Sequence, residues 1–183
     1  MKLTENPHKV ILITGRKRSG KTQFSNALIK AATNKTALVY QSPRDTTFNY
    51  LPLIADAKKY IGQRGRTSEI FVEYEDFLLM AYKAKNSIIL IDDFTGYEAD
   101  RISMNFRRLL SRNRHAGNTI IIVTHSLSDT PKRLFNLLDM IILFKTNENM
   151  ISNLNRLPEF EQLNNAVNKL KSKPEYKPEF IAL

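Results

Sequence analysis

An eight-residue stretch near the start of the chain limits the folds that it can adopt. Residues 15–22 read Gly-Arg-Lys-Arg-Ser-Gly-Lys-Thr and match the phosphate-binding loop pattern G-x-x-x-x-G-K-[ST] (Walker A) at every fixed position. The apolar run Val10–Thr14 precedes it and predicts a buried strand. Residues 22–32 follow it and predict a helix with Phe24, Ala27, Leu28 and Ala31 on one side. This succession predicts an α/β fold with a phosphate-binding site.

Each fixed residue of the loop has a chemical role. Gly15 and Gly20 let the backbone wrap tightly, so that consecutive N–H groups point at a phosphate, and the positive end of the following helix adds to this field. Lys21 is expected to reach the β- and γ-phosphates, and Thr22 to place its hydroxyl on Mg²⁺. The nucleotide is expected to contact Gly15, Arg16, Lys17, Arg18, Ser19, Gly20, Lys21, Thr22 and Gln23. The loop therefore predicts binding of a nucleoside triphosphate.

A second apolar run ends in two acids. Ser87–Ile91 predicts a buried strand, and Asp92 and Asp93 follow it directly. This is the pattern of a Walker B element, in which Asp92 would hold Mg²⁺ opposite Thr22. Asp93 stands where many ATPases place an acid that polarises the attacking water. The alternative is an ordinary strand-to-loop turn in which an acid caps a helix.

Strands and helices alternate along the rest of the chain. The expected strands are 36–41, 69–74, 119–124, 140–145 and 150–154, and the expected helices are 52–61, 75–85, 95–115, 130–138 and one that begins at Pro158. This alternation is typical of a mostly parallel sheet flanked by helices, in which ligands bind at the carboxyl ends of the strands. The predicted organisation is a P-loop ATPase core at 1–157, followed at 158–183 by a C-terminal helix and a basic, Pro-containing tail. This tail is expected to be loose, with docking through Phe180 and Ile181 as the alternative.

Composition narrows the classes of partner. The 183 residues suit one domain, and the absence of cysteine excludes disulfides and zinc–thiolate sites. No apolar run approaches the ~18 residues that span a bilayer, so we expect no integral membrane segment. The net charge of +10 favours a polyanionic partner, most simply nucleic acid. An anionic membrane surface and a generically basic protein are the alternatives.

The helix expected at 95–115 carries five arginines. Its core-facing stripe is expected to comprise Ile102, Phe106, Leu109 and Leu110. The arginines, Arg101, Arg107, Arg108, Arg112 and Arg114, fall on the remaining faces. They have three readings: a solvated face, a surface that contacts nucleic acid, or a subunit interface that presents an arginine to a neighbour's γ-phosphate.

Three segments taken together, Ile88–Asp93, Arg112–Gly117 and Ile120–Ser126, resemble the HerA/FtsK-type DNA-translocating ATPases. The sequence looks most like the small genome-packaging ATPases of membrane-containing and archaeal viruses. The resemblance covers roughly residues 9–146. It implies a RecA-like P-loop NTPase core of the ASCE type that uses ATP and Mg²⁺.

The resemblance also implies roles for residues outside the loop. Arg114 matches the position of the arginine finger that these ATPases supply to a neighbouring subunit, with Arg112 as the second choice. His125, after the strand expected at 119–124, matches the position of a residue that senses the γ-phosphate. Two positions depart from the family, which usually has Glu where Asp93 stands and Gln where His125 stands. The shorter acid would alter water positioning, and the histidine would make turnover sensitive to pH.

The resemblance predicts a homo-oligomeric ring that moves double-stranded DNA into a capsid, with capsid or vertex proteins as further partners. The expected location is the host-cell cytoplasm or the virion vertex. Candidate DNA contacts are Arg64, Arg66, Arg101 and Arg108. Three alternatives remain: a phage assembly or secretion ATPase, a P-loop nucleoside or nucleotide kinase whose lid is the arginine-rich helix, and a nucleotide-dependent switch without motor function.

Overall fold

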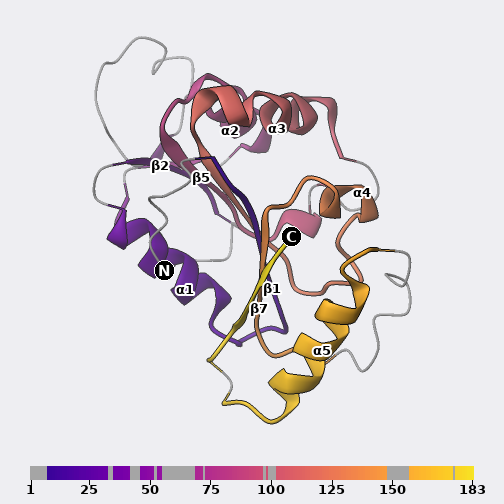
Figure 1. Ribbon diagram of the computed structural model, residues 1–183. Helices are drawn as coiled ribbons and strands as arrows, with labels where there is room; N and C mark the ends of the chain where they lie inside the picture. The colour runs from indigo at the N-terminus through magenta and orange to yellow at the C-terminus, as the bar shows by residue number, and fades with distance from the viewer. Residues whose placement is uncertain are drawn as a thin grey trace.

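The protein folds around a single central sheet with helices on both of its faces (Figure 1). The computed structural model describes residues 8–32, 35–41, 46–51, 53–54, 69–71, 73–96, 98, 102–147, 157–174 and 176–183. No helix in these ranges is long and apolar enough to cross a bilayer.

The sheet has eight strands among the described residues, in the spatial order β3-β4-β2-β5-β6-β1-β7-β8. They are β1 Val10–Thr14, β2 Thr36–Tyr40, β3 Leu53–Ile54, β4 Glu69–Phe71, β5 Ser87–Ile91, β6 Thr119–Val123, β7 Met140–Leu143 and β8 Glu179–Ala182. All neighbouring strands run parallel except β8, which is antiparallel to β7. Because β6 pairs with both β1 and β5, the carboxyl ends of these three strands lie together at one edge of the sheet.

The helices explain why the central strands β1, β5 and β6 are buried at every position. They are α1 Lys21–Ala31, α2 Tyr74–Lys83, α3 Met104–Ala116, α4 Lys132–Phe135 and α5 Phe160–Lys171, with a short 3₁₀ helix at Phe94–Gly96. Successive residues of a strand point to opposite faces of the sheet. In β1, Ile11 and Ile13 pack with Ile29 of α1, whereas Leu12 packs on the opposite face with residues of α2, α3 and α5. Both faces are therefore covered, and the expected mostly parallel α/β architecture is confirmed.

The arginine-rich helix starts later than expected. Residues 94–96 form the 3₁₀ helix, and α3 begins at Met104 after Ser103, whose hydroxyl accepts a hydrogen bond from the Phe106 N–H at 3.2 Å. A serine that satisfies a free N–H of the first turn is a strong helix start, and the apolar periodicity alone does not locate it. The expected core stripe is confirmed at Ile102, Phe106 and Leu109, which are buried, and Leu110 is half-buried.

One other expectation was wrong and one was borne out only in part. The helix expected at 52–61 is contradicted at its start, because Leu53–Ile54 is a strand paired with β4. The C-terminal tail is docked rather than loose, because β8 pairs with β7 and covers what would otherwise be an open sheet edge. Of the two residues expected to dock it, Ile181 is buried and Phe180 is exposed. Residues 55–61, the loop with Arg64 and Arg66, Arg101 and the strand expected at 150–154 lie outside the described residues.

The inward face of α1 matches the expected one only in part. The expected Phe24 and Leu28 are half-buried and pack against the core, whereas Ala27 and Ala31 are exposed. The fully buried residues are Lys21, Ser25 and Ile29. The phosphate-binding loop sets the rotation of this helix, because Lys21 must turn inward towards the loop.

Candidate active site

The phosphate-binding loop connects the carboxyl end of β1 to the first residue of α1. Its two fixed glycines have positive φ angles, 146° at Gly15 and 95° at Gly20. A Cβ atom at Gly15 would lie 2.7 Å from the Cβ of Phe144, so only glycine fits there. Gly20 is the N-cap residue of α1, and its φ lets the chain turn directly into the helix. The loop thus directs the free N–H groups at the start of α1 towards one point, which is an anion site.

The backbone of the loop orients Lys21. Its Nζ donates hydrogen bonds to the carbonyl oxygens of Gly15 at 2.7 Å and Arg16 at 2.8 Å. An ammonium has three donors, so these two bonds leave one for a phosphate oxygen. Burial lowers the Lys21 pKa from 10.5 to about 8, opposed by the negative charges of Asp92 and Asp93. The two acids after β5 therefore act electrostatically on the loop lysine, as the Walker B interpretation requires.

Asp92 and Thr22 are the candidate oxygen ligands for a metal ion at the phosphate-binding loop. Asp92 is 6 % exposed, and its N–H donates to the carbonyl oxygen of Tyr40 at 2.9 Å, which anchors it at the end of β5. Thr22 is the second residue of α1. Within the described ranges no group of three or more His, Cys, Asp or Glu side chains forms a metal cage. A carboxylate and a hydroxyl fit Mg²⁺, which usually takes one or two protein ligands and completes its shell with water and substrate phosphates.

Asp93 and His125 face each other beside the loop. The Nε2 atom of His125 lies 3.6 Å from Oδ1 of Asp93, and both side chains are partly exposed. Asp93 has a φ of 54°, so the chain turns sharply as it leaves β5. Burial, assisted by the charge of Lys21, lowers the His125 pKa below its ordinary value of 6.5 despite the nearby Asp93. The imidazole is therefore neutral at pH 7. Its Nδ1 atom is buried without a hydrogen-bond partner in the described part of the chain.

A cavity of about 770 Å³ adjoins the loop. It is lined by Arg16, Lys17, Arg18, His125, Ser126, Asp129, Thr146, Asn147 and Tyr176. Its walls thus come from the loop, the segment after β6, the segment after β7 and the segment before β8. The sequence analysis missed Thr146, Asn147 and Tyr176, since no motif marks them and Tyr176 lies in the segment expected to be loose.

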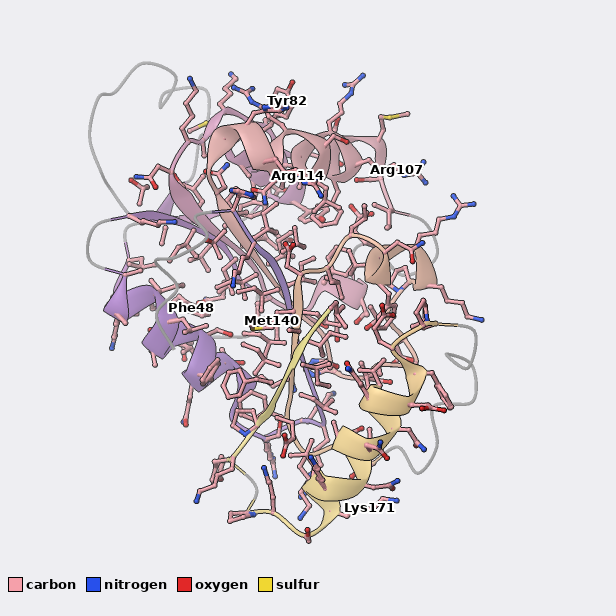
Figure 2. All side chains as sticks on the ribbon, in the orientation of Figure 1. Phe48, Tyr82, Arg107, Arg114, Met140 and Lys171 are labelled. Carbon is pink, nitrogen blue, oxygen red and sulfur yellow. The ribbon has the colours of Figure 1, made fainter. Side chains whose placement is uncertain are left out.

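The two candidate arginine fingers lie far from the phosphate-binding loop of the same chain. Arg112 and Arg114 are in the last turns of α3, just before β6 begins at Thr119. Because β6 runs parallel to β1, they lie towards the amino end of the strands and the loop lies at the carboxyl end, about 16 Å away for a strand of five residues. The Arg112 guanidinium stacks on the Tyr82 ring, 4.6 Å from its centroid. Arg114 is exposed and has no hydrogen bond or ion pair to any described residue (Figure 2).

The strand–loop–helix unit, the strand inserted between β1 and β5, and the acids after β5 define a class of protein. The chain has the RecA-like α/β fold of P-loop NTPases of the ASCE type, with a mostly parallel sheet flanked by helices. No family model matches the sequence, and no curated protein matches it.

Solved structures share this fold. The genome-packaging NTPase B204 from Sulfolobus turreted icosahedral virus 2, in complex with AMP, is 18 % identical with a TM-score of 0.75, over 97 % of this chain and 94 % of that one. B204, the DNA-packaging ATPase from Sulfolobus turreted icosahedral virus, is 20 % identical with a TM-score of 0.71, over 97 % and 93 % of the two chains. The N-terminal domain of zonular occludens toxin from Neisseria meningitidis is 19 % identical with a TM-score of 0.50, over 76 % and 78 %. The resemblance to packaging-type P-loop ATPases is thereby confirmed in the fold.

Proposed function

We propose that this chain is an Mg²⁺-dependent ATPase that assembles into a ring and translocates double-stranded DNA, as the motor that packages a viral genome. The observation that carries the proposal is the grouping of Lys21, Asp92, Asp93 and His125 around one phosphate-binding loop. The likeness of 97 % of the chain to NTPases described as genome-packaging supports the choice of cargo.

The residues of one subunit supply most of what hydrolysis needs. The N–H groups of the loop and the third donor of Lys21 would hold the β- and γ-phosphates, and Thr22 and Asp92 would hold Mg²⁺. Bound Mg²⁺ would neutralise part of the charge on the phosphate oxygens. Asp93 would take a proton from the attacking water, whose oxygen bonds to the γ-phosphorus as the bond to the bridging oxygen breaks, which gives ADP and phosphate. The neutral His125 imidazole orients the Asp93 carboxylate through Nε2.

The missing component is a further positive charge on the γ-phosphate. Arg112 and Arg114, in the last turns of α3, lie at the opposite end of the strands and cannot reach the nucleotide of their own subunit. An exposed Arg114 can reach the site of a neighbour in a ring, and it is a better candidate than Arg112, which stacks on Tyr82. The placement of these two arginines also argues against a kinase in which they form the lid, because a kinase lid must close over its own phosphates.

The net charge of +10 suits a DNA backbone. Exposed Arg108 is the described candidate for a DNA contact, and Arg64, Arg66 and Arg101 remain candidates outside the described residues. Such contacts are to phosphates, so binding should tolerate any sequence and weaken steeply with salt. Capsid or vertex proteins would then direct the motor to its genome in the host cytoplasm.

The test is ATP hydrolysis over a range of protein concentrations, with and without long double-stranded DNA. Turnover per subunit should rise with both. Arg114→Ala should lower it by roughly 10³-fold or more, the range of arginine fingers. Arg107→Ala, another exposed arginine of α3, is the matched control (Figure 2). Asp93→Asn should abolish hydrolysis and retain ATP binding.

Mixing two inactive variants distinguishes a finger that acts between subunits. A Lys21→Ala subunit cannot bind nucleotide but still presents Arg114 to its neighbour. An Arg114→Ala subunit binds nucleotide but presents no arginine. A mixed ring therefore regains sites in which both groups are intact, and activity should return. Turnover that is independent of concentration and DNA, with no rescue on mixing, would refute the motor.

A further inference from the structure

The segment that joins α5 to β8 places an aromatic ring against the phosphate-binding loop. A Cβ atom at Gly20 would lie 2.9 Å from Cδ1 of Tyr176, so the ring packs directly on the loop backbone. The Tyr176 side chain is nevertheless 67 % exposed, and it belongs to neither cluster of core residues. Burial of this ring in the core does not explain its position.

The fold holds this segment in place. Its two ends are joined by an ion pair between Lys173 and Glu179. Within it, the N–H of Lys177 donates to the carbonyl oxygen of Pro174 at 3.2 Å and closes a turn. Glu179 is also the first residue of β8 and is the register partner of Leu143 at the end of β7. Tyr176 is thus positioned by a closed turn that is attached to the sheet.

The exposed ring lines the cavity of about 770 Å³ beside the loop, together with Thr146 and Asn147. Arg16 ties the loop to this wall: its N–H donates to the carbonyl oxygen of Lys145 at 2.9 Å, and its Nη1 donates to Oδ1 of Asn147 at 3.3 Å. The volume lies within the range of small-molecule sites, and an aromatic face with a few polar groups is their usual lining. The wall is also fixed relative to the phosphates.

The phosphate site and this cavity meet at Gly20. The free N–H groups at the start of α1 are the expected phosphate site, and the Tyr176 ring lies against the first residue of that site, so a group attached to the phosphates is within reach of the ring. We propose that Tyr176 stacks on the base of the bound nucleotide and that Thr146 and Asn147 line the edge of that base. This inference rests on the proposed nucleotide-binding function. Since every nucleobase has a π-face, Tyr176 favours nucleoside triphosphates as a class over inorganic polyphosphate.

The test compares Mg-ATP with Mg-tripolyphosphate, which has the phosphates but no base, by titration calorimetry. Wild type should bind ATP more tightly than tripolyphosphate. Tyr176→Ala should weaken ATP binding by about 5- to 100-fold, the range of base–aromatic stacking, and leave tripolyphosphate binding unchanged. Tyr176→Phe should retain the wild-type ratio. Tyr50→Ala is the matched control, because Tyr50 is also exposed but bonds to Asn26 on α1, away from the cavity.

A spectroscopic arm reports stacking directly. The chain has no tryptophan, so 2-aminopurine riboside triphosphate can be excited selectively. Its fluorescence should be quenched on binding to wild type and to Tyr176→Phe, and not to Tyr176→Ala at saturating concentration. If the ratio of ATP affinity to tripolyphosphate affinity is the same in Tyr176→Ala as in wild type, the stacking role is overturned, and continued tripolyphosphate binding shows that the phosphate site is intact. If wild type binds neither ATP nor tripolyphosphate, the nucleotide-binding function is overturned and this inference with it.

Discussion

Removing the charge of Lys21 should change how the stability of the unliganded protein depends on pH. Burial lowers the pKa of Lys21 from 10.5 to about 8 in the folded protein, and its side chain is only 4 % exposed. Holding this ammonium in the fold therefore costs free energy at pH 7. The difference of about 2.5 pH units corresponds to about 3 kcal/mol at 1.36 kcal/mol per unit.

The sign follows from proton binding. Between pH 8 and pH 10.5 the unfolded chain holds the Lys21 proton and the folded protein has released it, so the free energy of unfolding rises with pH. Methionine has no proton to release. The difference in unfolding free energy between wild type and Lys21→Met should therefore move in favour of wild type by about 2.5 kcal/mol between pH 7 and pH 10.

Urea denaturation of both proteins at several pH values measures this difference. Lys30→Met, which removes an exposed lysine from the same helix, is the matched control for the loss of a lysine side chain. A difference between wild type and Lys21→Met that stays constant from pH 7 to pH 10 would refute the reasoning. The same titration should weaken ATP binding to wild type above pH 8, by up to tenfold per pH unit, because the phosphates need the charged lysine.

Two further predictions concern the loop and its neighbour. Gly15→Ala should destabilise the protein by roughly 2–4 kcal/mol, because the new Cβ would lie 2.7 Å from Phe144 at a positive φ. Gly117→Ala should cost only about 1 kcal/mol, because nothing lies within 4 Å of its Cβ position. Urea denaturation measures both free energies of unfolding. On the acid side, hydrolysis by wild type should begin to decline only below pH 6.5, where the His125 imidazole takes up a proton, and His125→Gln should lack this acid-side decline. A decline shared by both proteins would contradict the role of His125.

Short local patterns in the sequence were sufficient to predict most residues of the candidate active site. The loop at 15–22 and the acids after Ser87–Ile91 combine a short fixed pattern with an adjacent strand, and both elements are present as expected. The sequence also predicted that these strands end at the same edge of the sheet. Their apolar runs indicate parallel strands covered on both faces, and parallel strands have their carboxyl ends on the same side. The contact of His125 with Asp93 needed the additional fact that β6 pairs with β5.

Element boundaries were less predictable where a local bond competes with periodicity. The arginine-rich segment is apolar at helical spacing from Ile102 onwards, but the capping bond of Ser103 decides where α3 begins. In α1 the inward rotation of Lys21 outweighed the alanines at 27 and 31. In both cases one hydrogen-bonded side chain sets the helix, and a hydrophobic pattern averages over such contacts.

The sequence by itself determined the phosphate-binding loop, the acids opposite it and the parallel α/β class, because these depend on residues within a few positions of one another. Only the tertiary structure decided that the last strand closes the sheet edge beside β7, that Tyr176 lies on Gly20, and that Arg114 lies far from its own loop. These arrangements depend on pairs distant in the chain, such as Arg16 with Asn147, 131 positions apart. Which distant segments meet is a property of strand order, and strand order follows from the packing of the whole sheet.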